Sequence, residues 1–170
     1  VLCDIKDNYA MDLNTAYNSV MGTTKHVGSS WTEAHHLEKT LKLLHLIAGG
    51  EEAWRARPFV SQSNCFVVLP MKFAEESLEC LRIAVEGSMP VLLLSAGQAG
   101  ATAPACLAGT VSQAWAECLG GLVYVNAIKS GAPAILGTWP FVSDLRTGAM
   151  SGGSGEQALL TAGCAQMHRF

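Results

Sequence analysis

The sequence has 170 residues, of which 49% are hydrophobic and 15% are charged, and its formal net charge is -3. This length is sufficient for one domain with a hydrophobic core. So apolar a composition excludes an intrinsically disordered chain, and the weak negative charge provides no basic surface for a nucleic-acid backbone. We therefore expect a folded domain that has no nucleic-acid partner.

Neither a secretion signal nor a membrane segment is predicted. Residues 1–12 carry charges where the apolar core of a signal peptide would lie. The longest apolar stretch, residues 104–128, contains Gln113, Glu117 and Asn126, which is typical of a buried helix and not of a membrane span. The sequence lacks an initial methionine and stops at AQMHRF within an expected helix. We therefore expect a piece of a longer protein.

The cysteines are scattered along the chain and form no C-x-x-C pair: Cys3, Cys65, Cys80, Cys106, Cys118 and Cys164. Several fall inside expected strands or helices, where a free thiol serves as a small core side chain. This usage is typical of the reducing cytosol and not of a disulfide framework. We therefore predict free thiols and a cytoplasmic location.

In chain order, the first predicted strand covers residues 25–31 and leads into a helix over residues 33–48, whose leucines share one face. That helix ends at Gly49 and Gly50. A short helical piece over residues 51–57 follows and stops before a proline. The second predicted strand begins directly after it.

The second strand is predicted over residues 59–67 and is followed by a helix over residues 73–86. The third and fourth strands are almost continuously apolar, as in parallel strands covered on both faces. A long helix separates them, opening at Pro104 in its first turn. The last helix begins near Ser154, where S-G-E-Q fits a capping box. The third strand is predicted over residues 90–95, the long helix over residues 104–129 and the fourth strand over residues 132–138.

This alternation of strands and helices predicts an α/β fold built from right-handed parallel units. An open doubly wound sheet and a closed eight-stranded barrel both satisfy the pattern. In either architecture, ligands bind at the carboxyl ends of the strands. Three segments therefore attract interest: residues 95–104, residues 138–155 and the polar residues 62–64 that interrupt the second strand.

The segment from Gly97 to Thr102 precedes a helix, so its backbone N–H groups could hold an anion. The alternative, that its glycines only permit tight turns, is slightly favoured. The run from Gly152 to Gly155 superficially resembles a dinucleotide fingerprint. It lies too far behind its strand for that interpretation.

Residues 139–146 form the most function-like cluster. The faces of Trp139 and Phe141 could attract a quaternary ammonium group, Asp144 could add a negative charge, and Arg146 could bind a substrate carboxylate. An ion pair between Asp144 and Arg146 at the surface, beside a packed tryptophan, explains the same residues equally well.

The histidines do not predict a metal site. None belongs to an H-E-x-x-H pattern, and His35 and His36 are neighbours whose side chains should point apart on a helix. We therefore interpret them, together with His26 and His45, as ordinary surface or core residues.

From about Asn14 onward the sequence resembles the trimethylamine methyltransferase family. The segments that carry the resemblance are TTKHVGSSW, GGEEAWRARP, GATAP-x-x-LAG and DLRTGA-x-x-GGS, in this order. The resemblance implies an eight-stranded TIM barrel, of which this chain would provide about four strand–helix units. It also implies transfer of an N-methyl group from a methylated amine to the cobalt of a separate corrinoid protein. The chain itself would bind no cofactor.

Some members of that family use pyrrolysine to activate trimethylamine, whereas others demethylate quaternary amines such as glycine betaine. Only standard residues occur here. A quaternary nitrogen already makes a neutral amine the leaving group, so the reaction needs mainly positioning. We therefore expect a quaternary or otherwise activated methylamine. The expected catalytic residues are Asp144 and Arg146, and the expected binding residues are Gln62, Asn64, Ser95, Gln98, Trp139 and Phe141.

Two other functions stay open. A barrel lyase or aldolase would need a Schiff-base lysine or clustered acids at a strand end, but Lys25 lies at the start of its strand. A non-catalytic binding role is the other alternative. Because half a barrel would leave strand edges unpaired, we also expect the missing half or a second copy to be needed, and the protein to be a homo-oligomer.

Overall fold

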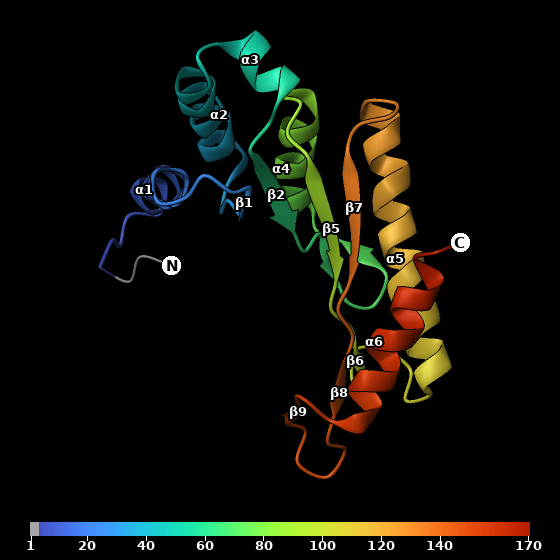
Figure 1. Ribbon diagram of the computed structural model, residues 1–170. Helices are drawn as coiled ribbons and strands as arrows, with labels where there is room; N and C mark the ends of the chain where they lie inside the picture. The colour runs from blue at the N-terminus through green and yellow to red at the C-terminus, as the bar shows by residue number, and fades with distance from the viewer. Residues whose placement is uncertain (1–3) are drawn as a thin grey trace. The chain divides into compact units, whose positions relative to one another are not determined.

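The computed structural model describes residues 4–170, and Cys3 lies outside this range (Figure 1). By their contacts the residues divide into two units. The first contains residues 4–64, Glu75–Leu92 and Val125–Ile135. The second contains Cys65–Ala74, Leu93–Tyr124 and Leu136–Phe170.

The α/β prediction is confirmed. A four-stranded parallel sheet has the order β1-β2-β5-β7, and β1 pairs with β2 from Val27↔Val60 to Ser29↔Gln62. The strands of this sheet are β1 (Val27–Ser29), β2 (Val60–Asn64), β5 (Val91–Ser95) and β7 (Ala134–Thr138). They therefore keep the order in which they occur along the chain.

The helices of the first unit are α1 (Asn8–Met21), α2 (Ala34–Ala48), α3 (Glu51–Ala56) and α4 (Glu75–Glu86). Of these, α2 and α4 pack through leucine-containing apolar stripes. Leu37 and Leu44 of α2 and Leu81 of α4 are fully buried. Helix α2 ends as predicted, with Gly49 in the left-handed conformation at φ 89°. Trp54 of α3 is also fully buried, and its indole N–H donates to the Gly87 carbonyl at 2.9 Å.

Helix α1 is absent from the sequence-based predictions. Its segment, NYAMDLNTAYNSVM, contains three asparagines and lacks a strong apolar stripe. The structure gives it a well-defined start, because the Asp7 carboxylate accepts a hydrogen bond from the Ala10 N–H at 2.7 Å.

The second unit contains α6 (Gly155–Met167) and all of α5 (Leu107–Ile128) up to Tyr124. A short hairpin of β3 (Val67–Val68) and β4 (Lys72–Phe73) precedes them in the chain. The predicted strand over residues 59–67 is therefore two strands, because the chain leaves β2 at Asn64 and pairs again only in this hairpin.

A second small sheet of this unit has the order β6-β8-β9, from β6 (Gln98–Ala99), β8 (Phe141–Ser143) and β9 (Met150–Ser151). Ala99, Val142 and Leu160 form its buried apolar cluster. Helix α6 starts at the predicted cap, where the Ser154 hydroxyl accepts the Gln157 N–H at 3.2 Å. The Gln157 side chain accepts from Gly153 at 2.6 Å, one residue before the position that a capping box requires.

The prediction that the third and fourth strands are covered on both faces is only partly right. In β5, Val91, Leu93 and Ser95 are buried and the alternate residues are half-buried. In β7, Ile135 is 58% exposed. One face of β5 is therefore fully covered and its other face only partly, while β7 is partly covered and exposes Ile135.

The described cysteines are free, as predicted, and Cys80, Cys118 and Cys164 are buried. None of the helices between residues 4 and 170 combines the length and the apolar character needed to cross a membrane.

Candidate functional site

The loops after β5 and β7 meet in the second unit. The Trp139 N–H donates to the Ser95 carbonyl at 2.7 Å, and the Phe141 N–H donates to the Gly97 carbonyl at 2.8 Å. Gln98 then pairs with Phe141 in the parallel ladder of β6 and β8. These predicted site residues therefore lie along one continuous backbone ladder at the carboxyl end of β5.

Trp139 and Phe141 form an aromatic pair in this ladder. Their ring centroids are 5.0 Å apart and the ring planes are tilted by 48°. Trp139 is 56% exposed, so much of the indole remains available to a ligand. An exposed aromatic face is the feature through which a quaternary ammonium group is recognised.

The segment from Gly97 to Thr102 forms a tight turn. The N–H groups of Ala101, Thr102 and Ala103 all donate to the Gln98 carbonyl, at 2.9 to 3.0 Å. Gly100 adopts φ 85°, which favours glycine. Because these N–H groups are already used, the turn interpretation is the better one and the anion site is not supported.

Asp144 and Arg146 belong to the turn between β8 and β9. The Asp144 carboxylate accepts the Arg146 N–H at 2.9 Å and the guanidinium Nε at 3.5 Å. These hydrogen bonds lower the pKa of Asp144, the backbone N–H of Arg146 having the largest effect. Arg146 is 90% exposed, so this pair matches the surface ion pair that the sequence left open.

The two halves of the predicted 139–146 cluster have different surroundings. Asp144 and Arg146 line a cavity of about 390 Å³ in the second unit, together with Gly100, Ser151 and Glu156. Neither Trp139 nor Phe141 lines this cavity. Val142 and Ser143 of β8 line this cavity, whereas the Phe141 ring packs against Trp139.

Ser95 is buried and belongs to a hydrogen-bonded network around Glu117. The Ser95 hydroxyl donates to Glu117 Oε2 at 2.5 Å, while Glu117 Oε1 accepts from the Met71 N–H at 2.9 Å and from the Gln113 amide at 3.0 Å. Glu117 is fully buried on α5. Ser95 therefore faces the helix that covers its strand. The sequence feature that could have indicated this network is Glu117 itself, a single carboxylate in an otherwise apolar helix, four residues after Gln113.

Gln62 and Asn64 of the first unit are also buried. The Asn64 amide donates to the Ser77 carbonyl of α4 at 2.7 Å. Gln62 shares this face of β2, and its Oε1 has no hydrogen-bond partner among the described residues. Both side chains therefore belong to the face of β2 that packs on α4.

A polar network at the carboxyl end of β1 was missed by the sequence analysis. Asp12 and His36 are both buried, and Asp12 Oδ2 lies 2.8 Å from His36 Nδ1. The same oxygen accepts the Thr32 N–H at 2.9 Å and the Thr32 hydroxyl at 2.8 Å. Asp12 and Thr32 line a cavity of about 390 Å³ with Ser29, Trp31 and Ser63. The network was missed because α1, which carries Asp12, was not predicted.

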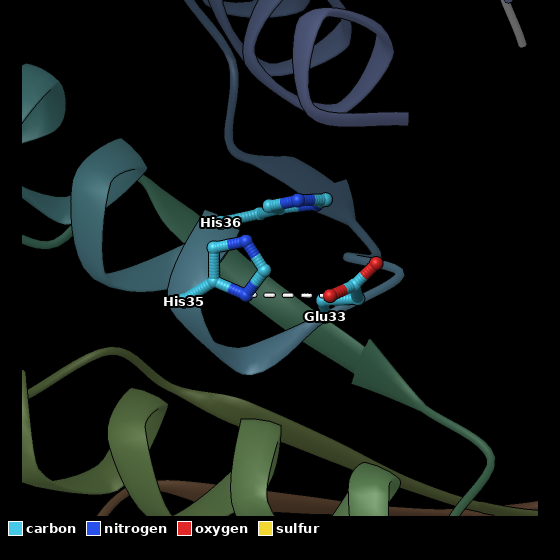
Figure 2. Close-up of side chains that lie close together, drawn as sticks. All are labelled: Glu33, His35 and His36. Atoms are coloured by element: carbon cyan, nitrogen blue, oxygen red, sulfur yellow. Dashed lines mark ion pairs between the residues drawn. The ribbon is translucent and has the colours of Figure 1, made fainter. Parts of the chain in front are cut away.

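His35 and His36 do not point apart as predicted. Their ring centroids are 4.3 Å apart in an edge-to-face arrangement, and with Glu33 they form a group whose ligand atoms all lie within 4.8 Å of one another (Figure 2). The physical reason is that helical side chains lean toward the amino end. There Glu33 holds His35 at 3.3 Å and Asp12 holds His36.

Residues 2–170 match the family model described as trimethylamine methyltransferase (MTTB). The chain is 33% identical over 168 residues to a glycine betaine methyltransferase of Desulfitobacterium hafniense strain Y51, covering 98% of this chain and 34% of that protein. It is 30% identical over 148 residues to a trimethylamine methyltransferase MttB of D. hafniense strain DCB-2, a match that covers 87% of this chain and 30% of that protein. It is 27% identical over 171 residues to the trimethylamine methyltransferase MttB of Methanosarcina thermophila, a match that covers 98% of this chain and 35% of that protein. The chain thus spans about a third of the length of these relatives.

Proposed function

We propose, from the premise that this chain belongs to the trimethylamine methyltransferase family, that it forms part of an enzyme that demethylates a quaternary methylamine. The methyl acceptor in this proposal is the cobalt of a separate corrinoid protein. The observation that carries the proposal is a match over almost the whole chain, together with relatives named for glycine betaine and trimethylamine. The free cysteines are consistent with a cytoplasmic enzyme.

We further propose that these strands belong to an eight-stranded TIM barrel. In a doubly wound sheet the strand order reverses at a switch point, whereas β1-β2-β5-β7 follows chain order throughout. The open face of β7, where Ile135 is exposed, would face the packed interior of the barrel. Further strands or a second copy of the chain would then complete the fold, and a homo-oligomer is part of this proposal.

The proposed substrate contacts come from the aromatic pair. Trp139 and Phe141 would face the cationic nitrogen, each contact contributing roughly 0.5–2 kcal/mol, with Gln98 beside them in the ladder. Asp144 and Arg146 line a cavity that the aromatic pair does not line, so we assign them no contact with the ammonium group held by Trp139 and Phe141. Because Gln62, Asn64 and Ser95 face the helices, we assign them to positioning the strand ends.

This arrangement suits a reaction in which the protein mainly positions its substrate. A quaternary nitrogen leaves as a neutral amine, so no side chain has to protonate the leaving group. The aromatic faces would hold the cation and direct one methyl group toward the acceptor. A lyase or aldolase is less well supported, because Lys25 precedes β1 at its amino end, away from the strand ends where ligands bind.

The test mixes the protein with a reduced corrinoid protein and with glycine betaine or trimethylamine, and follows the cobalamin absorbance. We expect methylation of the cobalt with the quaternary amine and a loss of about tenfold or more in kcat/KM for Trp139→Ala, from one or two lost cation–π contacts. Trp115→Phe, in α5, is the matched control. Unchanged kinetics for Trp139→Ala would contradict the aromatic site, and no methylation with any methylated amine would contradict the function.

A further inference from the structure

Glu33, His35 and His36 bring together the side chains that bind transition metals. They lie at the start of α2, directly after the carboxyl end of β1. Figure 2 shows the three side chains around a common space, with the ion pair between Glu33 and His35 marked. One imidazole from each histidine and one carboxylate provide the N and O donors that zinc prefers.

The spacing is close to that of a zinc site. Two ligands at about 2.0–2.1 Å from a tetrahedral ion lie roughly 3.3–3.4 Å apart. Glu33 Oε2 and His35 Nδ1 are 3.3 Å apart already. The ligand atoms of all three residues lie within 4.8 Å of one another, so the side chains need to close by about 1.5 Å at most to reach the spacing of a tetrahedral set.

A buried carboxylate orients one of these ligands. His36 is held through Nδ1 by Asp12 at 2.8 Å, and both side chains are almost fully buried. Asp12 is held in turn by the Thr32 N–H and hydroxyl. A carboxylate on Nδ1 fixes the ring tautomer and leaves the Nε2 lone pair for a metal, as in the carboxylate–histidine–zinc arrangement. Asp12 therefore holds the His36 ring in place.

Solvent can reach the other side of the cluster, because Glu33 and His35 are exposed. An ion could enter from this side and keep water at its fourth position, which is the arrangement of an open zinc site. The carboxyl end of a strand is also where parallel α/β proteins bind their ligands. His36 is buried while Glu33 and His35 are open to solvent, and this combination distinguishes the cluster from charged side chains that meet only at the surface.

We propose that Glu33, His35 and His36 bind a divalent transition-metal ion of the zinc class, with Asp12 orienting His36. The site shares no residue with the aromatic pair and does not rest on the proposed methyl transfer. Ligand identities favour zinc, cobalt or nickel over magnesium and calcium, which prefer all-oxygen sites.

The experiment titrates the tag-free, chelator-treated protein with Zn²⁺ by calorimetry and with Co²⁺ by visible absorbance. We expect one ion per chain, tetrahedral d–d bands, no thiolate charge-transfer band and a rise in Tm on binding. His35→Ala and Glu33→Gln change exposed residues and should fold normally. His35→Ala should weaken binding by about 100-fold or more, and Asp12→Asn by about 10–100-fold, as for other residues that orient a metal ligand.

His26→Ala is the matched control, because His26 is an exposed histidine of the same unit outside the cluster. It should leave the affinity and the d–d bands unchanged. Three results would overturn the proposal: no saturation at one ion per chain, equal affinities for His35→Ala and the unchanged protein, or a thiolate band that assigns the ion to cysteines. None of them bears on methyl transfer, so the two proposals can fail separately.

Discussion

Replacing Gly121 by alanine tests how closely α5 packs against the segment that carries Phe66. An ideal Cβ at Gly121 would lie 2.9 Å from Cε1 and Cε2 of Phe66 and closer still to Cζ. Phe66 is fully buried, so the ring cannot move into solvent. The neighbouring Gly120 faces the ring of Phe73, with an ideal Cβ 2.7 Å from its Cζ. Phe73 is 37% exposed and can swing outward.

The magnitudes follow from two opposing effects. Alanine in place of glycine in a helix interior is favoured by about 1 kcal/mol. Forcing a methyl group into a packed core costs typically 1–3 kcal/mol, and a displaced Phe66 would also disturb its edge-to-face contact with Phe73, whose centroids are 5.3 Å apart. We expect Gly121→Ala to lower the free energy of unfolding by about 1–2 kcal/mol. Gly120→Ala should stay within about 0.5 kcal/mol of the unchanged protein, because the helical gain offsets a smaller rearrangement.

Urea unfolding monitored by circular dichroism measures both variants, with equal m values as the check that unfolding is comparable. Replacing Phe66 by leucine removes the ring that the new methyl group at position 121 would meet. Phe66→Leu should therefore cost less stability in the Gly121→Ala variant than in the unchanged protein. If Gly121→Ala were as stable as Gly120→Ala, or if the two substitutions were simply additive, the close approach of α5 to Phe66 would be refuted.

Burial raises the pKa of the Cys80 thiol to about 11 and that of Cys118 to about 12, from an ordinary value of 9.0. At pH 8 both thiols should react with a thiol reagent far more slowly than the exposed Cys65. The free energy of unfolding should fall as the pH rises above 9, because the thiols ionise more easily in the unfolded chain than in the folded protein. Rapid modification of Cys80 and Cys118 in the native protein would contradict their burial. For the network at Glu117, Glu117→Ala should cost about 3 kcal/mol or more in urea unfolding, because the Ser95 hydroxyl and two N–H donors lose their acceptor, whereas Glu117→Gln should cost less than about 1.5 kcal/mol. Equal losses for these two variants would show that the hydrogen bonds contribute little.

Much of the fold could be predicted from local sequence signals. Residues 34–48 became α2 because leucines recur on one face and Gly49 can adopt a positive φ. Residues 91–95 became β5 because the run is apolar and β-favouring. The strands of the small sheet, β6, β8 and β9, were not predicted, because two or three residues are too few to display an alternation. Their pairing depends on contacts between segments far apart in the chain.

The candidate site was harder to predict, because the direction of each side chain depends on which face of a strand the helices cover. Polar residues inside apolar strands were interpreted as pocket residues. Asn64 instead donates to the Ser77 carbonyl of α4, and Ser95 donates to Glu117 of α5. A polar group on the helix-covered face needs a buried partner, and the partner here lies 13 residues away in one case and 22 in the other. Spacing along the chain could not reveal either pair.

The contrast between Ser95 and Trp139 links this packing to the proposed aromatic site. The Trp139 N–H donates to the Ser95 carbonyl, while the Ser95 hydroxyl is fixed by Glu117 on the covered side. The backbone of Ser95 therefore connects the buried network to the backbone of the exposed indole. A side chain that binds a cation must keep its face in place without a ligand, since ordering it on binding would cost affinity. Glu117 thus holds the end of β5, to whose backbone Trp139 is hydrogen-bonded.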